Sequence, residues 1–135
     1  AFESGGAGLV STVEDYAKFA KMLMNKGELN GVRILGRNTV EFMARNGLTP
    51  EQRKTFNWDS TKGHGYGNFM RILEDPAAAG LIQSEGSFGW DGWMGCYFSL
   101  DPKEQLCILY FIQQAGAGTT DSIRRLQNIA WGAVE

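Results

Sequence analysis

The stretch that decides the fold runs from Met94 to Gln114, "MGCYFSLDPKEQLCILYFIQQ". Two apolar runs flank "DPKE" (101–104), and Asp followed by Pro is typical of a turn. The pattern predicts a β-hairpin in which Leu100 pairs with Gln105. In that register one face carries Cys96, Phe98, Cys107, Leu109 and Phe111, and the other carries Tyr97, Ile108, Tyr110 and Ile112.

The second strand of this hairpin is apolar on both faces, and a sheet with two apolar faces is covered on both sides. One cover follows directly, because "TTDSIRRLQNIAWGAV" (119–134) predicts an amphipathic helix. Its inward side chains are expected to be Ile123, Leu126, Ile129, Ala130 and Ala133. The other cover is expected from earlier helices or from another part of the polypeptide.

Two earlier helices are predicted. In "STVEDYAKFAKMLMNKG" (11–27), Thr12 is placed to cap a helix and Asp15 follows three residues later. The apolar stripe of this helix consists of Val13, Tyr16, Ala17, Ala20, Leu23 and Met24. The second helix lies in "RNTVEFMARNG" (37–47) and ends at Gly47. Its inward side chains are Val40, Met43 and Ala44.

The remaining segments are shorter. Asn30-Gly31 predicts a tight hairpin turn between the two helices. Residues 48–64 are expected to be a loop with a helical turn after Pro50, residues 65–74 one strand, and residues 75–80 a turn. The order is helix, helix, three antiparallel strands, helix, which predicts an α+β fold in a single domain spanning residues 1–135.

Composition restricts the classes of function. The net charge is −2 and no basic run occurs, which argues against a nucleic-acid partner. The longest apolar run, "LCILYFI", is far shorter than a membrane helix. With one histidine and two cysteines at the wrong spacing for zinc, no metal or other cofactor is expected, and Cys96 and Cys107 are expected to be free thiols.

Glycines and tryptophans alternate in "GSFGWDGWMG" (86–95), just before the predicted hairpin. One interpretation is a bulged turn with two tryptophans packed at the surface. The other is a backbone kept bare so that a ligand can approach it. The residues alone leave both interpretations open.

The order of elements and several phrases resemble the serine β-lactamase-like hydrolases, which include class C β-lactamases, DD-peptidases and related esterases. The phrases are "SGGAGLVSTVEDYAKFAKMLMNKGELNGVRIL", "GYG" and "GSFGWDGWMGCYFSLDPKEQLCILYFIQ". The resemblance implies a β-lactamase/transpeptidase-like fold and acyl transfer by a serine in Ser-x-x-Lys, a tyrosine, and a third motif beside the serine. Because the chain opens on "AFESGGAGLVS", we expect it to be the C-terminal part of a larger domain.

Only the third motif is matched. No Ser is followed three residues later by Lys, and Tyr66-Gly67-Asn68 is interpreted as packing at the edge of the sheet. Trp90-Asp91-Gly92 falls where the third motif stands. The resemblance implies that Trp90, Asp91 and Gly92 contact the substrate and that the Trp93 N–H donates to the oxyanion. It also implies that the three glycines at 89, 92 and 95 keep bulk away from the ligand.

The departure from a Lys-Thr-Gly motif bears on the substrate. Trp90 brings no charge to a substrate carboxylate, and Asp91 would repel one if it faced the pocket. A neutral ester, or a substrate carrying an amine, is therefore expected. His64 has no identifiable Ser or Cys partner and is interpreted as a loop residue.

Two hypotheses follow. The chain is the C-terminal part of a serine hydrolase acting on a small ester or peptide-like substrate, inactive without the upstream part of the same polypeptide. Alternatively, it is a non-catalytic binding or interaction domain that retains the fold. Ser-x-x-Lys and a later Tyr-x-Asn or Tyr-x-Ser in upstream sequence would separate the two.

Overall fold

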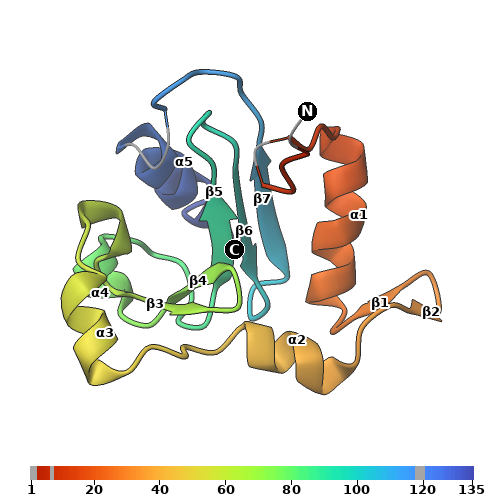
Figure 1. Cartoon of the computed structure of the whole chain (residues 1–135), viewed down its shortest axis with the longest axis horizontal. Helices are drawn as coiled ribbons and strands as arrows, with labels where there is room; N and C mark the ends of the chain where they lie inside the picture. Colours follow the sequence, from red (N-terminus) through yellow and green to blue (C-terminus); the bar gives the residue numbers. More distant parts are fainter. Residues whose placement is uncertain (1–2, 7, 118–120) are drawn as a thin grey trace.

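The computed structural model describes residues 3–6, 8–117 and 121–135, and an antiparallel sheet lies between helices (Figure 1). The elements are α1 (Val13–Met24), β1 (Glu28–Leu29), β2 (Val32–Arg33), α2 (Arg37–Met43), α3 (Pro50–Thr55), the 3₁₀ turn η1 (Asp59–Thr61), β3 (His64–Gly67), β4 (Met70–Leu73), α4 (Pro76–Ala79), β5 (Phe88–Asp91), β6 (Tyr97–Asp101), β7 (Leu106–Tyr110) and α5 (Asp121–Trp131). The α+β fold class is confirmed. None of the helices within the described residues has both the length and the apolar character to cross a bilayer.

The main sheet has five strands, two more than the sequence predicts, in the order β3-β4-β5-β6-β7. Residues 65–74 were expected to form one strand but fold as the β3–β4 hairpin, and β5 is a strand of its own. The hairpin turns at Asn68 and Phe69, whose φ angles are 27° and 70°. An aromatic residue at position 69 is typical of a strand, yet this side chain is 82% exposed at the turn.

The β6–β7 hairpin is confirmed, but its register is displaced by two residues. Leu100 pairs with Cys107, and the turn comprises residues 102–105. The turn lies further along the chain because the Asp101 carboxylate accepts hydrogen bonds from the backbone N–H groups of Lys103 and Glu104, at 3.0 and 3.2 Å. A displacement of two keeps every side chain on its expected face. Cys96 and Cys107 are not joined by a disulfide in the structure, and Cys107 is exposed.

Helix α1 covers one face of the sheet and lies to the right of the strands in Figure 1. Thr12 caps it as predicted, since its hydroxyl accepts a hydrogen bond from the Asp15 N–H at 3.1 Å. The predicted apolar stripe was partly wrong: Val13 is 42% exposed, whereas Met22 is buried. The core on this face consists of Ala20, Met22, Leu23, Val40, Met70, Ile72, Phe88, Phe98 and Leu100.

The connections between α1 and the sheet follow local sequence. Strands β1 and β2 form the predicted hairpin, with Asn30 and Gly31 at positive φ. The helical turn expected after Pro50 is α3, where Thr49 and Gln52 exchange backbone-to-side-chain hydrogen bonds of 3.3 and 2.9 Å. The turn expected at residues 75–80 contains the short helix α4.

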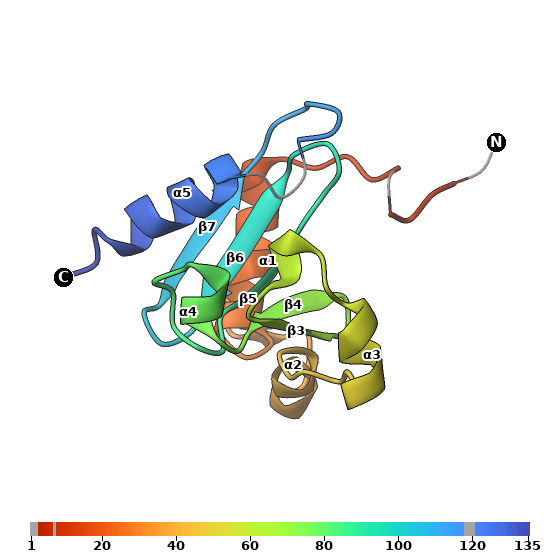
Figure 2. The same cartoon turned by 90° about the vertical axis from the view of Figure 1, so that its left-hand side faces the viewer.

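Helix α5 covers the opposite face, so the predicted C-terminal cover is confirmed; Figure 2 shows the strands between it and α1. Its inward face differs from the prediction. The buried side chains are those of Ile123, Gln127 and Trp131, whereas Ile129 is 72% exposed and Ala133 is exposed. Residues 119 and 120 of the predicted helix lie outside the described residues.

A polar layer lies between α5 and the sheet. The Gln127 amide donates to the Gln83 side-chain oxygen at 3.1 Å and to the Tyr97 hydroxyl. The Gln83 amide donates in turn to the Ser99 hydroxyl at 3.2 Å. Burial raises the pKa of Tyr97 to about 12, so this phenol is neutral at pH 7. The helix turns Gln127 inward because the loop before β5 and strand β6 supply hydrogen-bonding partners, Gln83 and Tyr97.

Asp101 joins three parts of the fold and is fully buried, with 0% of its surface exposed. Its carboxylate accepts hydrogen bonds from the Ser84 N–H at 2.9 Å and the Trp131 indole N–H at 2.7 Å, besides the two turn amides. Burial by itself would raise the pKa of this carboxyl, but the hydrogen bonds outweigh burial and hold the pKa below its ordinary value. Asp101 thus fastens α5 and the loop before β5 to the end of β6.

Replacing Asp101 with Asn should lower the free energy of unfolding at pH 7 by about 2 to 4 kcal/mol, because the amide NH₂ would face groups that are themselves donors. The folded pKa is depressed, so the stabilisation is fully present above the unfolded pKa of about 3.9 and is lost as the pH falls through the folded value. Urea unfolding of the intact protein at pH 7 and at pH values below 4 measures both effects.

Glu104→Gln is the matched control, because it makes the same acid-to-amide change at an exposed position of the same turn. We expect it to change the free energy of unfolding by less than about 0.5 kcal/mol. Equal effects of the two substitutions would show that the buried carboxylate has no special role.

Candidate active site

The candidate site lies where β5 runs past the end of β4. Strand β4 pairs only with the first half of β5, through Ile72↔Phe88 and Arg71↔Gly89. The second half, Trp90 and Asp91, pairs with β6 alone. One backbone edge of β5 is therefore open within the part of the chain that the structure describes, and an open strand edge can bind an extended ligand.

A tight turn follows this edge. The Gly92 N–H donates to the Cys96 carbonyl at 2.7 Å, and the Gly95 N–H donates to the Gly92 carbonyl at 2.9 Å. The Trp93 carbonyl accepts from the Gly116 N–H at 3.1 Å. The Trp93 N–H takes no part in these bonds, as is usual for the second residue of a β-turn, and the Trp93 side chain is 77% exposed.

The three glycines of this stretch stand there for different physical reasons. A Cβ at Gly89 would collide with the Phe98 carbonyl oxygen, so close packing of β5 on β6 requires glycine. Gly95 has a φ of 90°, and a Cβ there would lie 2.6 Å from the Ile112 side chain. At Gly92 the nearest atom would be 3.8 Å away, an ordinary contact. Packing therefore accounts for Gly89 and Gly95, whereas the bare backbone at Gly92 meets no demand of the fold.

Two hollows meet at the open edge. The first, here called the β5 groove, has a volume of about 240 Å³ and is lined by Trp58, Ser60, Thr61, Arg71, Trp90, Asp91, Gly92 and Trp93. The second has a volume of about 200 Å³ and is lined by Tyr16, Trp90, Asp91, Gly92, Cys96, Tyr97, Phe98 and Phe111. The structure thus brings the four residues that the resemblance implicates, 90 to 93, to the wall of one groove.

Arg71 pairs with Asp91 inside this wall. One guanidinium nitrogen lies 3.2 Å from an Asp91 carboxylate oxygen, and the two side chains are only 7% and 14% exposed. Another guanidinium nitrogen donates to the Ser60 carbonyl at 3.1 Å. The guanidinium carbon stands 5.1 Å from the centroid of the Trp90 ring, a cation–π distance. The negative charge expected at Asp91 is therefore compensated within the chain.

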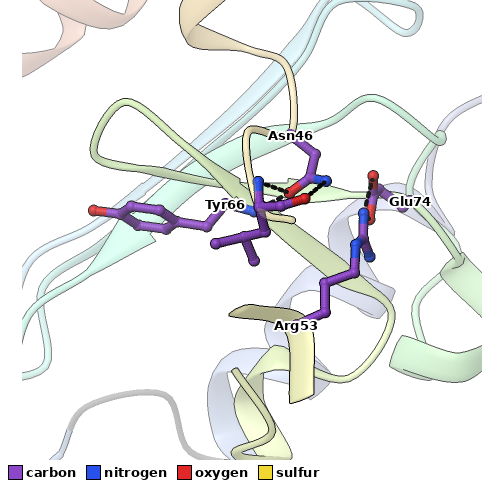
Figure 3. Close-up of polar contacts among 5 residues, drawn as sticks. Asn46, Arg53, Tyr66 and Glu74 are labelled. Carbon is purple, nitrogen blue, oxygen red and sulfur yellow. Dashed lines mark hydrogen bonds and ion pairs between the residues drawn. The ribbon is translucent and has the colours of Figure 1, made fainter. Parts of the chain in front are cut away.

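Tyr66 packs against the same tryptophan. Its ring centroid lies 5.3 Å from that of Trp90 and 5.8 Å from that of Phe56. Its backbone N–H donates to the Asn46 side-chain oxygen at 3.0 Å, and Figure 3 shows the ring turned away from that contact and from the Arg53–Glu74 pair. The structure thus gives Tyr66 contacts of the kind expected of a packing residue at the sheet edge.

His64 lies apart from the β5 groove. It begins β3 and lines a different cavity, of about 30 Å³, beneath α5. Burial lowers the pKa of its imidazole, and one ring nitrogen lies 2.8 Å from the Lys62 carbonyl oxygen. The sequence-based interpretation as a loop residue is corrected only in that His64 is the first residue of a strand.

Sequence reasoning missed Arg71 and Trp58. Arg71 lies 20 residues before Asp91, inside a segment that was expected to be one continuous strand. Its pairing with Asp91 depends on the β3–β4 turn and on the β4–β5 register, neither of which was predicted. Trp58 comes from the segment expected to be a loop and is 61% exposed at the groove.

Comparison with known proteins places the chain among related sequences and folds. The sequence model of the family described as Beta-lactamase matches residues 1–130. Protein Rv1367c of Mycobacterium tuberculosis is 34% identical over 117 residues, which cover 83% of this chain and 29% of that protein. The chain therefore spans less than a third of the length of this relative.

Solved structures share the fold. EstCE1, described as a hydrolase with promiscuous acyltransferase activity, superposes with a TM-score of 0.76 at 24% identity, covering 100% of this chain and 32% of EstCE1. Simvastatin synthase (LovD) from Aspergillus terreus superposes with a TM-score of 0.68 at 19% identity, covering 87% of this chain and 33% of LovD. The fold and the match over residues 1–130 agree, and the chain belongs to the Beta-lactamase family.

Proposed function

We propose that this chain supplies the oxyanion-hole strand of a serine hydrolase that forms an acyl-enzyme with a small ester or amide. The observation that carries the proposal is the Trp93 backbone N–H, which lies outside the hydrogen bonds of its turn and next to the bare backbone of Gly92. A preorganised N–H beside an open strand edge is the kind of donor that stabilises a developing oxyanion. The family membership supports the same chemistry.

The four wall residues have distinct roles in this proposal. The Trp93 N–H donates to the oxyanion. Gly92 lets the substrate backbone or acyl group approach the strand edge, and Trp90 forms an apolar wall. Asp91 lines the groove but brings no net charge to it, since Arg71 compensates its carboxylate.

The attacking serine and its lysine come from the upstream part of the same polypeptide, because no Ser in the 135 residues is followed three residues later by Lys. The 135 residues by themselves are therefore inactive. Supporting the proposal, EstCE1, which shares the fold, is described as a hydrolase with promiscuous acyltransferase activity. A small acyl ester is the substrate that best suits a groove walled by tryptophans and a compensated ion pair.

The full-length protein that carries this chain should react covalently with a fluorophosphonate, because that reagent traps an activated serine. Mass spectrometry should find one adduct on a serine upstream of the present residues. The isolated 135-residue chain, treated in parallel, should remain unlabelled. A full-length protein that forms no adduct while it is folded would exclude serine catalysis and favour a binding domain.

Substituting Gly92 with Ala in the full-length protein should lower kcat/KM for a simple ester by about 10- to 100-fold, because the methyl group stands where the acyl group must approach the strand. The free energy of unfolding should change by less than about 1 kcal/mol, since the added Cβ meets no atom closer than 3.8 Å. Steady-state kinetics and urea unfolding measure the two quantities.

Gly36→Ala provides the control, because Gly36 lies outside the groove, has a φ of −64° and would place its Cβ 3.4 Å from the nearest atom. We expect it to leave kcat/KM within about twofold of the unsubstituted value. If Gly92→Ala is as active as this control, the strand edge is not where the substrate binds.

A further inference from the structure

We infer that the Arg71–Asp91 ion pair leaves the wall of the β5 groove without net charge, so that the groove takes neutral, anionic and cationic acyl esters with similar efficiency while the pair is intact. This inference rests on the proposed function and adds a specificity-determining pair to it. Both side chains line the groove, and Asp91 lies in the Trp90-Asp91-Gly92 motif, which directly precedes Trp93, the proposed oxyanion donor.

The geometry holds the pair at the groove wall. The guanidinium of Arg71 touches three groups at once: the Asp91 carboxylate at 3.2 Å, the Ser60 carbonyl at 3.1 Å, and the face of Trp90 at 5.1 Å. A planar guanidinium can do this because its donors lie in one plane and its face remains available for stacking. Arg71 lies on β4, and the groups that it contacts belong to η1 and β5, so the position of the charge is fixed by the tertiary fold.

Low exposure makes the pair act as a unit. With side chains 7% and 14% exposed, each charge is little screened by water, and either one alone would project a field into the adjacent groove. Together they present a dipole of nearly zero net charge. The groove therefore offers neither an isolated cation, which would favour a carboxylate-bearing substrate, nor an isolated anion, which would favour an amine.

The consequences of separating the two charges have opposite signs. Without the Asp91 carboxylate, the positive charge of Arg71 lies beside the groove and favours anionic substrates. Without Arg71, the negative charge of Asp91 remains and favours cationic ones. A pair that served only to hold β4 against β5 would lower the activity toward all substrates alike. The sign of the change thus distinguishes a role in specificity from a purely structural role.

The experiment uses the full-length protein and three esters that share one acetyl group: phenyl acetate, 3-acetoxybenzoate and 3-acetoxy-N,N,N-trimethylanilinium. They are neutral, anionic and cationic, and kcat/KM is measured for each. For the unsubstituted protein, the three values should agree within about threefold once corrected for the leaving-group reactivity measured in hydroxide solution. A preference above tenfold for either charged ester would overturn the inference without any variant being made.

Variants then test the sign. Asp91→Asn should raise the anionic-to-neutral ratio of kcat/KM about fivefold and lower the cationic-to-neutral ratio, and Arg71→Met should do the reverse. The double variant should return both ratios to within about twofold of the starting values. Arg71→Lys, which keeps the charge but loses the planar fork, should keep the ratios while lowering kcat/KM for all three esters. The changes in these ratios should be smaller at about 0.5 M salt, because dissolved ions in the open groove screen the unpaired charge from the substrate.

Glu74→Gln is the matched control, because Glu74 pairs with Arg53 at 2.6 Å outside the groove (Figure 3). It should leave all ratios unchanged. If Asp91→Asn and Arg71→Met shift the ratios in the same direction, or not at all, while the fluorophosphonate still labels the protein, the inference fails and the proposed function stands. Absence of both labelling and ester hydrolysis would remove the proposed function and, with it, this inference.

Discussion

The carboxylate of Asp101 is the contact on which most of the architecture depends. It accepts four hydrogen bonds from groups that are distant in sequence or would otherwise be unpaired: the Ser84 amide, the Trp131 indole and two turn amides. These bonds set where the β6–β7 turn begins, hold the end of α5, and anchor the loop that leads into β5. A buried carboxylate is costly to desolvate, and this number of donors is what makes its burial stable.

From this anchor the fold determines the geometry of the candidate site. Strand β5 lies in the middle of the sheet, but the pairing of β4 with β5 starts only at Arg71, which leaves the end of β5 open on one side. Gly89 allows β5 to lie close to β6, and Gly95 closes the turn that leaves the Trp93 N–H outside the turn's hydrogen bonds. Packing requires glycine at positions 89 and 95. It does not require glycine at position 92, which lies between them. The three glycines lie within seven residues of one another.

Much of this could be predicted from the sequence because it rests on local physics. Three features follow from near neighbours in the chain, and the structure contains all of them: the Thr12 cap, the Asn30-Gly31 turn and strand β7. The interior of α5 could not be read in the same way. Gln127 is buried because Gln83 and Tyr97 receive its hydrogen bonds, and those partners come from other elements. Prediction from an amphipathic pattern assumes that apolar side chains face the core, so Ile129 was wrongly expected to point inward.

Alternation, capping and motif spacing are properties of neighbouring residues, and they were enough to predict the fold class, the covering of both sheet faces and the absence of Ser-x-x-Lys from these 135 residues. The sequence also singled out residues 90 to 93. The folded structure was needed to show that Arg71 compensates Asp91 and that Trp58, the residue before η1, lines the groove. It was also needed to show that Gly92, unlike Gly89 and Gly95, is free of close packing. Those facts depend on strand register and on contacts between distant segments, where charge and space are shared by residues that no local pattern links.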